Sequence, residues 1–482
     1  MRVDPRRLAL FAAVVCAAGG LAFVAHGWLT RPFGRVEAEL VFQATRIQRG
    51  FPLYVEPAQG AWEMGAPPSR YYVLYTPLWP WLLAKLSPAD YLGVRAVGRA
   101  VNGLLFLATL GVVVRASRPE NRRAVLTGAL LAVGLGMLVR EAGTADADVA
   151  AVALATLGLV RLTHRGGLDG LSAALLAVAP LVKPSVLGTP VGAVAAHVVT
   201  QWKSGGRRLL GPLVVGGLAA GALAGVFHAW SHGEWLRHIA RATGQTLSFD
   251  RWLQEMGGRF MFLGLPHVVA GLYAVRRRAP LVATLPLGTS IAWSAFSMAK
   301  HGSGTQYWLE PTMAALVALG ACGPAPVASR AGVWLGWAGL VLALAVGGTS
   351  FPELLAAARE ERRWNAVVEA LRSHCTLRPG EVVVSSDSTL ELELDGRVIV
   401  PSWQTSYLVR NGKFPLDAWR SDLERADGPR WFVHSEDYLE PPPDRVEGIT
   451  EVSAFRKELR DVMEARFAYD TEIDGMLVYV RR

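Results

Sequence analysis

Long apolar segments separated by short charged loops run through roughly the first 350 residues of the chain. A helix that crosses a bilayer needs about 20 mostly apolar residues, and about eleven segments approach that length. They are residues 8–29, 93–114, 124–139, 149–162, 168–182, 186–199, 209–230, 260–275, 281–298, 307–322 and 333–349. The pattern predicts a polytopic all-α membrane bundle of about eleven transmembrane helices.

The pattern changes after residue 349, where charged residues become frequent and short alternations replace the long apolar runs. The spacing predicts helices at residues 364–375, 415–425 and 453–466 and strands at 381–386, 397–400, 430–434 and 476–480. Helices alternating with strands are typical of a small α/β domain. We therefore expect a transmembrane domain over residues 1–349, with a large outer loop at 30–92, and a soluble α/β domain over 350–482.

The basic residues of the apolar region gather in every second loop. Clusters lie within residues 115–123, 161–165, 203–208 and 276–278, as the positive-inside rule expects for cytoplasmic loops. This placement predicts that loop 30–92 and the C-terminal domain are extracytoplasmic. It also accounts for the net charge of +9, so we expect no nucleic-acid partner.

Composition excludes several other classes. Hydrophobic residues make up 51% and charged residues 18% of the chain, against roughly 25% charged in a soluble protein. Disordered, collagen-like and single-domain soluble proteins are therefore excluded. The three cysteines, Cys16, Cys322 and Cys375, are too few for a disulfide framework or a Cys-rich metal site.

Two pairs of acidic residues lie on the expected outer side. Glu37 and Glu39 follow the first span, where a carboxylate can act as a general base toward a hydroxyl or hold a metal. The alternative is that they are solvated loop glutamates. Asp146 and Asp148 precede the fourth span, and two carboxylates at this spacing either chelate a divalent ion or interact with a helix N-terminus.

Basic residues gather on the same expected side, against the positive-inside rule. They are Arg95, Arg99, Lys183, Lys300 and His301. Binding of a phosphate head group by at least two of them would explain this placement. The alternative for each is snorkelling, in which the long side chain reaches the membrane interface.

The order of these motifs resembles that of the GT-C superfamily of membrane glycosyltransferases, and in particular the bacterial relatives of protein mannosyltransferases and of the aminoarabinose transferase. The resemblance rests on Glu37, Ala44, Gly50, Pro52 and Tyr54; on Tyr71, Tyr75, Pro77 and Leu78; on Arg99; on Lys183 and Pro184; and on Lys300, Gly302 and Tyr307. Many relatives carry Asp-Glu in the first outer loop, whereas this chain has Val36 at the Asp position. The catalytic carboxylate is accordingly either Glu37 or Glu39.

The resemblance implies an enzyme of the bacterial plasma membrane that transfers a sugar from a polyprenyl-phosphate donor to the hydroxyl of an unidentified glycan, lipid or protein acceptor, with inversion. It implies that Glu37 or Glu39 is the base. The donor phosphate would be held by Lys300, His301 and Lys183 with Arg95 or Arg99, and Tyr307 belongs to the same site. Some members of the superfamily use a divalent metal and others do not, so the resemblance leaves open a metal at Asp146 and Asp148 and implies no other cofactor.

Two other function classes remain open. A transporter or flippase would line its substrate path with intramembrane charges, but the chain has no detectable repeat, and many transporters are built from repeats. A non-catalytic assembly factor would use the C-terminal domain to bind a partner, and Val36 is consistent with that reading.

Overall fold

The structure of the chain is a computed structural model. It describes residues 4–30, 35–59, 70–135, 142–202, 206–242, 247–259, 264–300, 304–323, 362–378, 381–385, 387–395, 397–399, 412–435 and 460–482, together with 341–342, 344–345, 348, 352, 355, 359 and 408–409. His301 and most of the expected span 333–349 lie outside these residues.

The chain forms two compact units, each built from three separate stretches of sequence. The first contains Met1–Thr30, Gly98–Val226 and Thr246–Ala357. The second contains Arg31–Val97, Phe227–Gln245 and Ala358–Arg482. The large outer loop therefore belongs to the same unit as the C-terminal region, an association that hydropathy along the chain does not reveal.

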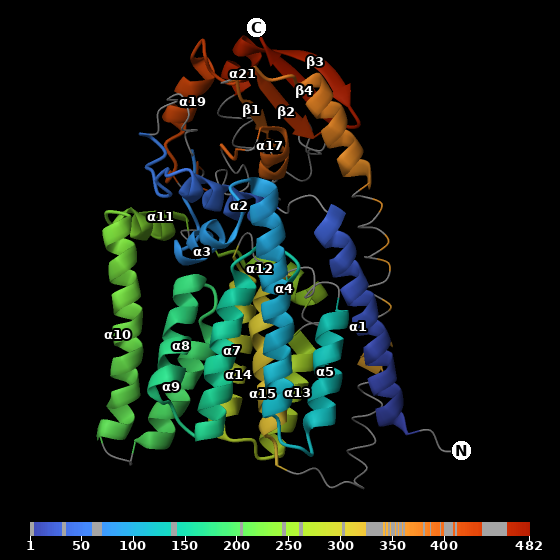
Figure 1. Cartoon of the computed structure of the whole chain (residues 1–482), viewed down its shortest axis with the longest axis vertical. Helices are drawn as coiled ribbons and strands as arrows, with labels where there is room; N and C mark the ends of the chain where they lie inside the picture. The colour runs from blue at the N-terminus through green and yellow to red at the C-terminus, as the bar shows by residue number, and fades with distance from the viewer. Residues whose placement is uncertain are drawn as a thin grey trace. The chain divides into compact units, whose positions relative to one another are not determined.

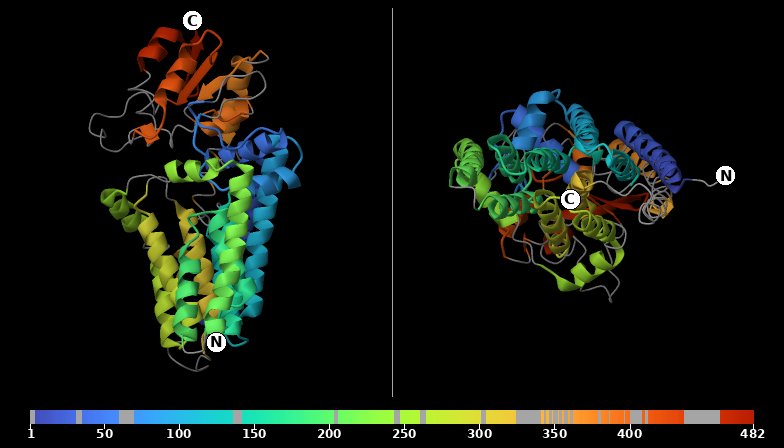
Figure 2. Two further views of the ribbon diagram at one scale, coloured as in Figure 1. Left: turned by 90° about the vertical axis from the view of Figure 1, so that its left-hand side faces the viewer. Right: turned by 90° about the horizontal axis from the view of Figure 1, so that it is seen from below.

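The first unit is helical where it is described, and its helices run alongside one another (Figures 1 and 2). It contains α1 (Pro5–Thr30), most of α4 (Tyr91–Ala116) and α10 (Gly206–Trp230), α5 (Arg122–Gly134), α7 (Asp148–Arg165), α8 (Gly170–Val182), α9 (Gly188–Gln201), α12 (Phe249–Arg259), α13 (Leu265–Arg276), α14 (Leu281–Ser297), the 3₁₀ helix η2 (Thr305–Trp308) and α15 (Leu309–Ala321). Neighbouring helices pack in the pairs α9–α14, α7–α8 and α1–α5, and α15 packs against α7, α14, α13 and α5.

Small residues allow the closest of these helix pairs to form. Gly188 and Gly192 lie one turn apart on the side of α9 that meets α14, and a Cβ atom added at Gly188 would lie 2.5 Å from the Cα of Ser290. Glycine at such positions lets two helix backbones approach, as is common between membrane helices. Thr289 uses this proximity to donate a hydrogen bond across the helices to the Gly188 carbonyl, at 2.8 Å.

Three of the described helices are long and apolar enough to cross a membrane. They are Pro5–Ala22 within α1, then α4 and α10. The shorter apolar helices α8 and α14 contain Pro180 and Pro286, and a proline interrupts the backbone hydrogen bonds of a helix. A mostly helical chain with one small sheet agrees with the expected fold class, and the count of about eleven spans stays a prediction.

The second unit contains a four-stranded sheet in the order β1-β2-β4-β3. Its strands are β1 (Val383–Ser385), β2 (Trp431–Ser435), β3 (Phe467–Ile473) and β4 (Met476–Arg481). β1 pairs with β2 in parallel, and the other two pairings are antiparallel. Asp474 and Gly475 form the turn between β3 and β4 with φ of 49° and 82°, the positive values that a tight two-residue hairpin turn requires.

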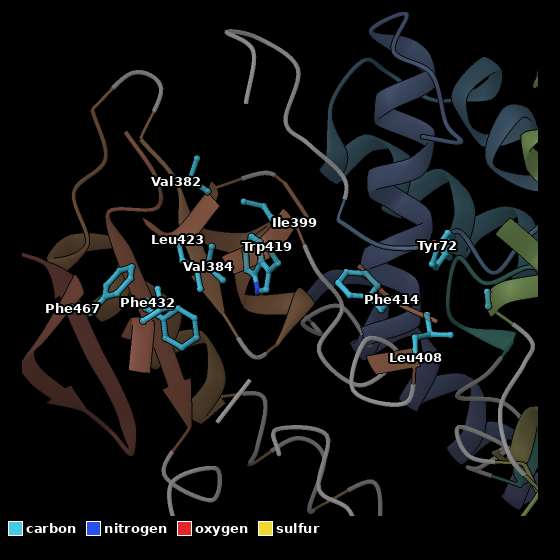
Figure 3. Packing of buried hydrophobic residues seen from close by; sticks show 12 residues of the cluster. Tyr72, Val382, Val384, Ile399, Leu408, Phe414, Trp419, Leu423, Phe432 and Phe467 are labelled. Atoms are coloured by element: carbon cyan, nitrogen blue, oxygen red, sulfur yellow. The ribbon is translucent and has the colours of Figure 1, made fainter. Parts of the chain in front are cut away.

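Two hydrophobic cores cover the two faces of this sheet, because side chains alternate along each strand. Val384 and Phe432 contribute to one core, and Val383, Trp431 and Val433 to the other. Figure 3 shows the first core, where α19 (Leu416–Glu424) supplies Trp419 and Leu423 beside Val384.

Tyr72, from the outer loop, joins this first core and meets Phe414 edge-on at 6.4 Å between ring centroids. The remaining helices of the unit are α2 (Arg35–Gln48), α3 (Leu78–Leu86), α11 (Glu234–Ala242), α17 (Ser388–Asp395), α21 (Arg460–Arg466) and residues 362–374.

The C-terminal strands differ from the sequence expectation at two places. Residues 397–399 are not a strand, because the Ile399 N–H donates to the Glu391 carboxylate and its carbonyl accepts from the Arg70 N–H. The sequence prediction missed β3, whose exposed positions Asp470 and Glu472 weaken the apolar alternation. The expected strands at 381–386, 430–434 and 476–480 are confirmed as β1, β2 and β4.

A buried ion pair joins the outer loop to the C-terminal region within the second unit. The Arg70 guanidinium donates to both oxygens of Asp422, at 2.6 and 2.9 Å, and both side chains are about 5% exposed or less. We expect Arg70→Gln to destabilise the protein by about 3–5 kcal/mol, because the Asp422 charge would stay buried without its partner. Thermal unfolding of the purified protein measures the loss.

Arg420→Gln is the matched control. Arg420 also forms a two-pronged pair, with Asp461 at 2.7 and 3.1 Å, but these side chains are 35% and 68% exposed. An exposed pair contributes at most about 1 kcal/mol. Equal losses in the two variants would show that the Arg70–Asp422 pair does not hold the unit together.

Candidate functional site

Glu37 and Glu39 lie on α2 in the second unit and are buried, with exposures of 1% and 0%. The alternative reading of solvated loop glutamates is therefore wrong. Glu39 and Gln43 are one helical turn apart on the same face. Gln43 is also fully buried, and neither its amide oxygen nor its nitrogen has a hydrogen-bond partner among the described residues. One face of α2 thus carries two buried polar side chains, and the buried amide of Gln43 is costly unless a ligand meets it.

The Gly-x-Pro part of the motif shapes the end of α2. Gly50 has φ of 79°, a left-handed conformation that glycine adopts readily and that commonly ends a helix. The Arg46 side chain then folds over the turn, donating to the Pro52 carbonyl at 2.9 and 3.3 Å and covering the Phe51 ring at 5.9 Å. These contacts hold the segment that leads to Tyr54.

The aromatic segment of the motif surrounds a histidine that the sequence analysis did not identify. The Tyr54 hydroxyl donates to the Tyr75 carbonyl at 2.8 Å, and the rings of Tyr54 and Tyr72 meet His238 edge-on at 5.3 and 5.2 Å. The Val73 N–H donates to His238 Nδ1 at 3.0 Å. α11 is thereby fixed to residues 71–75. The sequence signal was weak, because His238 is one of two histidines in the expected outer loop 231–259 and belongs to no motif.

Burial sets the charge state of His238. Removal from water lowers its pKa from 6.5 to about 4, the Val55 carbonyl opposes this, and the positive charges of Arg237 and Arg241 add to the lowering. His238 is therefore neutral at physiological pH, with Nδ1 free to accept the hydrogen bond.

Arg95 pairs with a carboxylate of the C-terminal region. It lies in the second unit and forms an ion pair of 3.5 Å with Glu393 of α17. Glu393 also pairs with Arg372, at 3.6 Å. Arg95 therefore joins the start of α4 to the C-terminal region, whereas Arg99 belongs to the first unit and is 3% exposed.

The first unit brings Lys183 and Asp148 together as a buried ion pair with a short hydrogen bond. Lys183 directly follows α8, where Pro184 prevents the helix from continuing, and Asp148 is the first residue of α7. The side chains are 9% and 5% exposed. The snorkelling alternative is therefore wrong for Lys183, whose ammonium group is paired inside the unit.

Asp146 is fixed by its neighbours in the same unit. The Asn102 amide donates to the carbonyls of Thr144 and Asp146, at 2.7 and 2.6 Å, and the Thr144 hydroxyl donates to the Asp146 carboxylate at 3.1 Å. Arg99 lies one turn before Asn102 on the same face of α4. This places a buried cation on the side of α4 that holds the Asp146 loop.

The described residues do not fit a divalent metal at Asp146 and Asp148. The Asp148 carboxylate is occupied by Lys183. No group of three or more His, Cys, Asp and Glu converges anywhere in the described parts of the chain, although a protein-bound divalent ion usually takes several such ligands.

Lys300 and Tyr307 connect to Lys183 through α14. The Lys300 ammonium lies over the Trp293 ring, 5.3 Å from its centroid. The Trp293 indole donates to the Ser185 carbonyl at 2.6 Å, two residues after Lys183. The Ser294 hydroxyl donates to the Tyr307 carbonyl at 2.7 Å, and the Tyr307 side chain interacts electrostatically with Lys183 and Asp148. We call Asp148, Lys183, Trp293, Lys300 and Tyr307 the cation cluster.

Comparison with known proteins gives a single kind of match. No protein-family model matches the chain, and no curated protein matches its sequence. The structure of ArnT from Cupriavidus metallidurans in the apo state superposes with a TM-score of 0.59 at 14% identity, covering 97% of each chain. The chain has the fold of ArnT.

The structure of the same ArnT bound to undecaprenyl phosphate gives a TM-score of 0.57, also at 14% identity and with 97% of each chain covered. The match extends from the apolar helices through the C-terminal sheet. The GT-C fold that the motif order implied is therefore confirmed.

We expect Lys183→Met and Asp148→Asn each to destabilise the protein by about 3–5 kcal/mol, because each leaves one buried group without its partner. The double variant should lose clearly less than the sum of the two, because the remaining groups are both uncharged. Melting temperatures of the four proteins measure this coupling.

Arg161→Gln is the control for this cycle. Arg161 pairs with Asp169 at 2.6 Å, but the side chains are 38% and 31% exposed, so its removal should cost at most about 1 kcal/mol. Additive losses for Lys183 and Asp148 would show that the two residues serve separate partners.

We also expect the stability of the protein to fall as the pH drops from 6.5 toward 4. Unfolded chains take up a proton on His238 in this range, whereas the folded protein does not. The loss approaches about 3 kcal/mol at the low end. Thermal unfolding across this range measures the slope, and His238→Asn should reduce it, since an amide oxygen accepts from Val73 without titrating.

His232→Asn is the matched control, because His232 is an exposed histidine of the same unit and Asn tolerates its φ of 52°. A slope that His238→Asn leaves unchanged would exclude His238 as its source.

Proposed function

We propose that this chain is a membrane glycosyltransferase that moves a sugar from a polyprenyl-phosphate donor to an acceptor hydroxyl, with inversion at the anomeric carbon. One observation carries the proposal: the fold match to ArnT spans 97% of both chains, and ArnT has been crystallised with undecaprenyl phosphate. The buried polar groups of this chain supply the acid and base chemistry that such a reaction needs.

The cation cluster is the proposed site of the donor phosphate. Lys183, Lys300 and Tyr307 belong to it, and Arg99 and His301 are the further ligands we assign. Positive groups held away from water interact strongly with a phosphate. They also stabilise the negative charge that grows on the phosphate as the sugar leaves, which is commonly the largest contribution to catalysis. The ion pair of Arg95 with Glu393 favours a structural role for Arg95.

Glu37 or Glu39 is the proposed general base. The carboxylate takes the proton from the acceptor hydroxyl as the hydroxyl oxygen bonds to the anomeric carbon. The bond between that carbon and the phosphate oxygen breaks, and polyprenyl phosphate leaves with the electron pair. Burial of both glutamates supports this role, because bulk water does not compete with the acceptor hydroxyl for a carboxylate that is removed from it.

The proposal places the enzyme in the bacterial plasma membrane as a multi-pass protein. The three long apolar helices support this location. Loop 30–92 and the C-terminal domain are then extracytoplasmic, on the side where the arginine clusters are absent. We retain residues 1–349 and 350–482 as the proposed transmembrane and soluble domains.

We expect the purified protein to release radiolabelled polyprenyl phosphate from a labelled polyprenyl-phosphate sugar when an extract of cell-envelope acceptors is supplied. Replacing the catalytic base by glutamine should lower the turnover number by about 10²–10⁴-fold, so one of Glu37→Gln and Glu39→Gln should show a loss of this size. Glu369→Gln is the matched control, because Glu369 is an exposed glutamate of the same unit.

Full activity in both Glu37→Gln and Glu39→Gln would overturn the assignment of the base. Exchange of labelled substrate across proteoliposome membranes without any sugar transfer would show a transporter instead. If the protein catalyses neither transfer nor exchange and its C-terminal domain retains a partner protein, the protein is an assembly factor.

A further inference from the structure

A groove runs between α4 and α5 in the first unit, two helices that lie side by side in Figure 1. Its volume is about 430 Å³. The side of α4 contributes Leu107, Leu110, Gly111 and Val114, and the side of α5 contributes Leu126, Ala129, Leu130 and Val133. Each set follows the spacing i, i+3, i+4 and i+7, so each forms one continuous apolar stripe along its helix.

Two arginines stand at one end of this apolar groove. Among the described residues that line it, Arg115 and Arg122 are the charged ones, and both are exposed. The Arg122 guanidinium donates to the Arg115 carbonyl at 3.4 Å, which holds it over the end of α4. The segment 115–123 also contains Arg118 and Arg123, and its single acidic residue is Glu120. The arginine end is therefore strongly positive.

The groove is open along its length among the described residues. A Cβ atom added at Gly111 would meet no atom within 4 Å. Leu107 and Leu126 are 42% and 38% exposed. The two stripes therefore leave a slot wide enough for a further chain of apolar atoms, and a slot of this kind is favourable only when apolar material fills it.

We propose that this groove binds one anionic phospholipid. An acyl chain lies between the two apolar stripes, and the phosphate accepts hydrogen bonds from Arg115 and Arg122. Basic pockets between membrane helices bind anionic head groups in this way. Charge complementarity selects an anionic lipid over a zwitterionic one, and the arginine end places it in the leaflet on the side of the basic loops. The inference does not rest on the proposed function.

Native mass spectrometry of the purified protein tests this proposal, with dioleoylphosphatidylglycerol and dioleoylphosphatidylcholine as probes. The two lipids have the same acyl chains and differ in net charge, so the first should bind at least tenfold more tightly. An arginine near a head group contributes roughly a fivefold gain in affinity. Arg115→Gln with Arg122→Gln should therefore weaken phosphatidylglycerol binding about thirtyfold.

Two further variants separate the parts of the site. Gly111→Leu places a side chain in the groove at a position where an added Cβ meets no atom within 4 Å, and it should also abolish the tight binding. Its control is Gly217→Leu on α10, where an added Cβ likewise meets nothing. The control for charge is Arg207→Gln with Arg208→Gln, two exposed arginines at the start of α10. Both controls should bind as the unaltered protein does.

Equal binding of the two lipids would overturn the proposal. So would an equal loss in the Arg207/Arg208 variant, which would show unspecific attraction to surface charge. Unchanged binding in Gly111→Leu would show that the acyl chain lies elsewhere and would also overturn it.

Discussion

A charged side chain that leaves water needs a partner of opposite charge or a set of hydrogen bonds, and this constraint organises both units. In the first unit, Lys183 and Asp148 satisfy it for each other and thereby join the end of α8 to the start of α7. In the second unit, Arg70 and Asp422 join the outer loop to α19. Each of these two ion pairs holds together segments that are distant in the sequence.

The same constraint gives the candidate site its chemical character. Lys300 has an aromatic ring beneath it, and Lys183 has one carboxylate beside it. In the proposed function, both ammonium groups donate hydrogen bonds to the phosphate of the donor. Glu37 and Glu39 are removed from water in the same manner.

Much of the fold could be predicted from the sequence because the signals were local. Apolar length located α1, α4 and α10, and alternation located β1, β2 and β4. The order of Glu37, Gly50, Tyr71 and Lys183 indicated the superfamily fold. The prediction failed where a tertiary contact decides the conformation, as at Ile399, whose backbone groups bond to Glu391 and Arg70. β3 was missed because its charged residues weaken the apolar alternation. Pairing with β4 stabilises this strand.

Partners could not be predicted for the candidate residues, because pairing is a property of the fold and not of spacing. Arg95 and Arg99 are one turn apart in the sequence, yet they belong to different units, and Arg95 pairs with Glu393. From the sequence, Asp148 could be a metal ligand or an acid at a helix N-terminus. Only the structure shows that Lys183 is its partner. No sequence motif marks His238, and only the structure shows that tyrosine rings enclose it.

Glu393 illustrates how unevenly such a network responds to change. One carboxylate stands between two guanidinium groups, those of Arg95 and Arg372. If either arginine is lost, the other still neutralises the acid. If the acid is lost, both attractions are lost with it and the repulsion between the two guanidinium groups remains, although Arg372 keeps its pair with Glu369 at 3.2 Å. Replacement of Glu393 should therefore be tolerated much less well than replacement of Arg95 or Arg372.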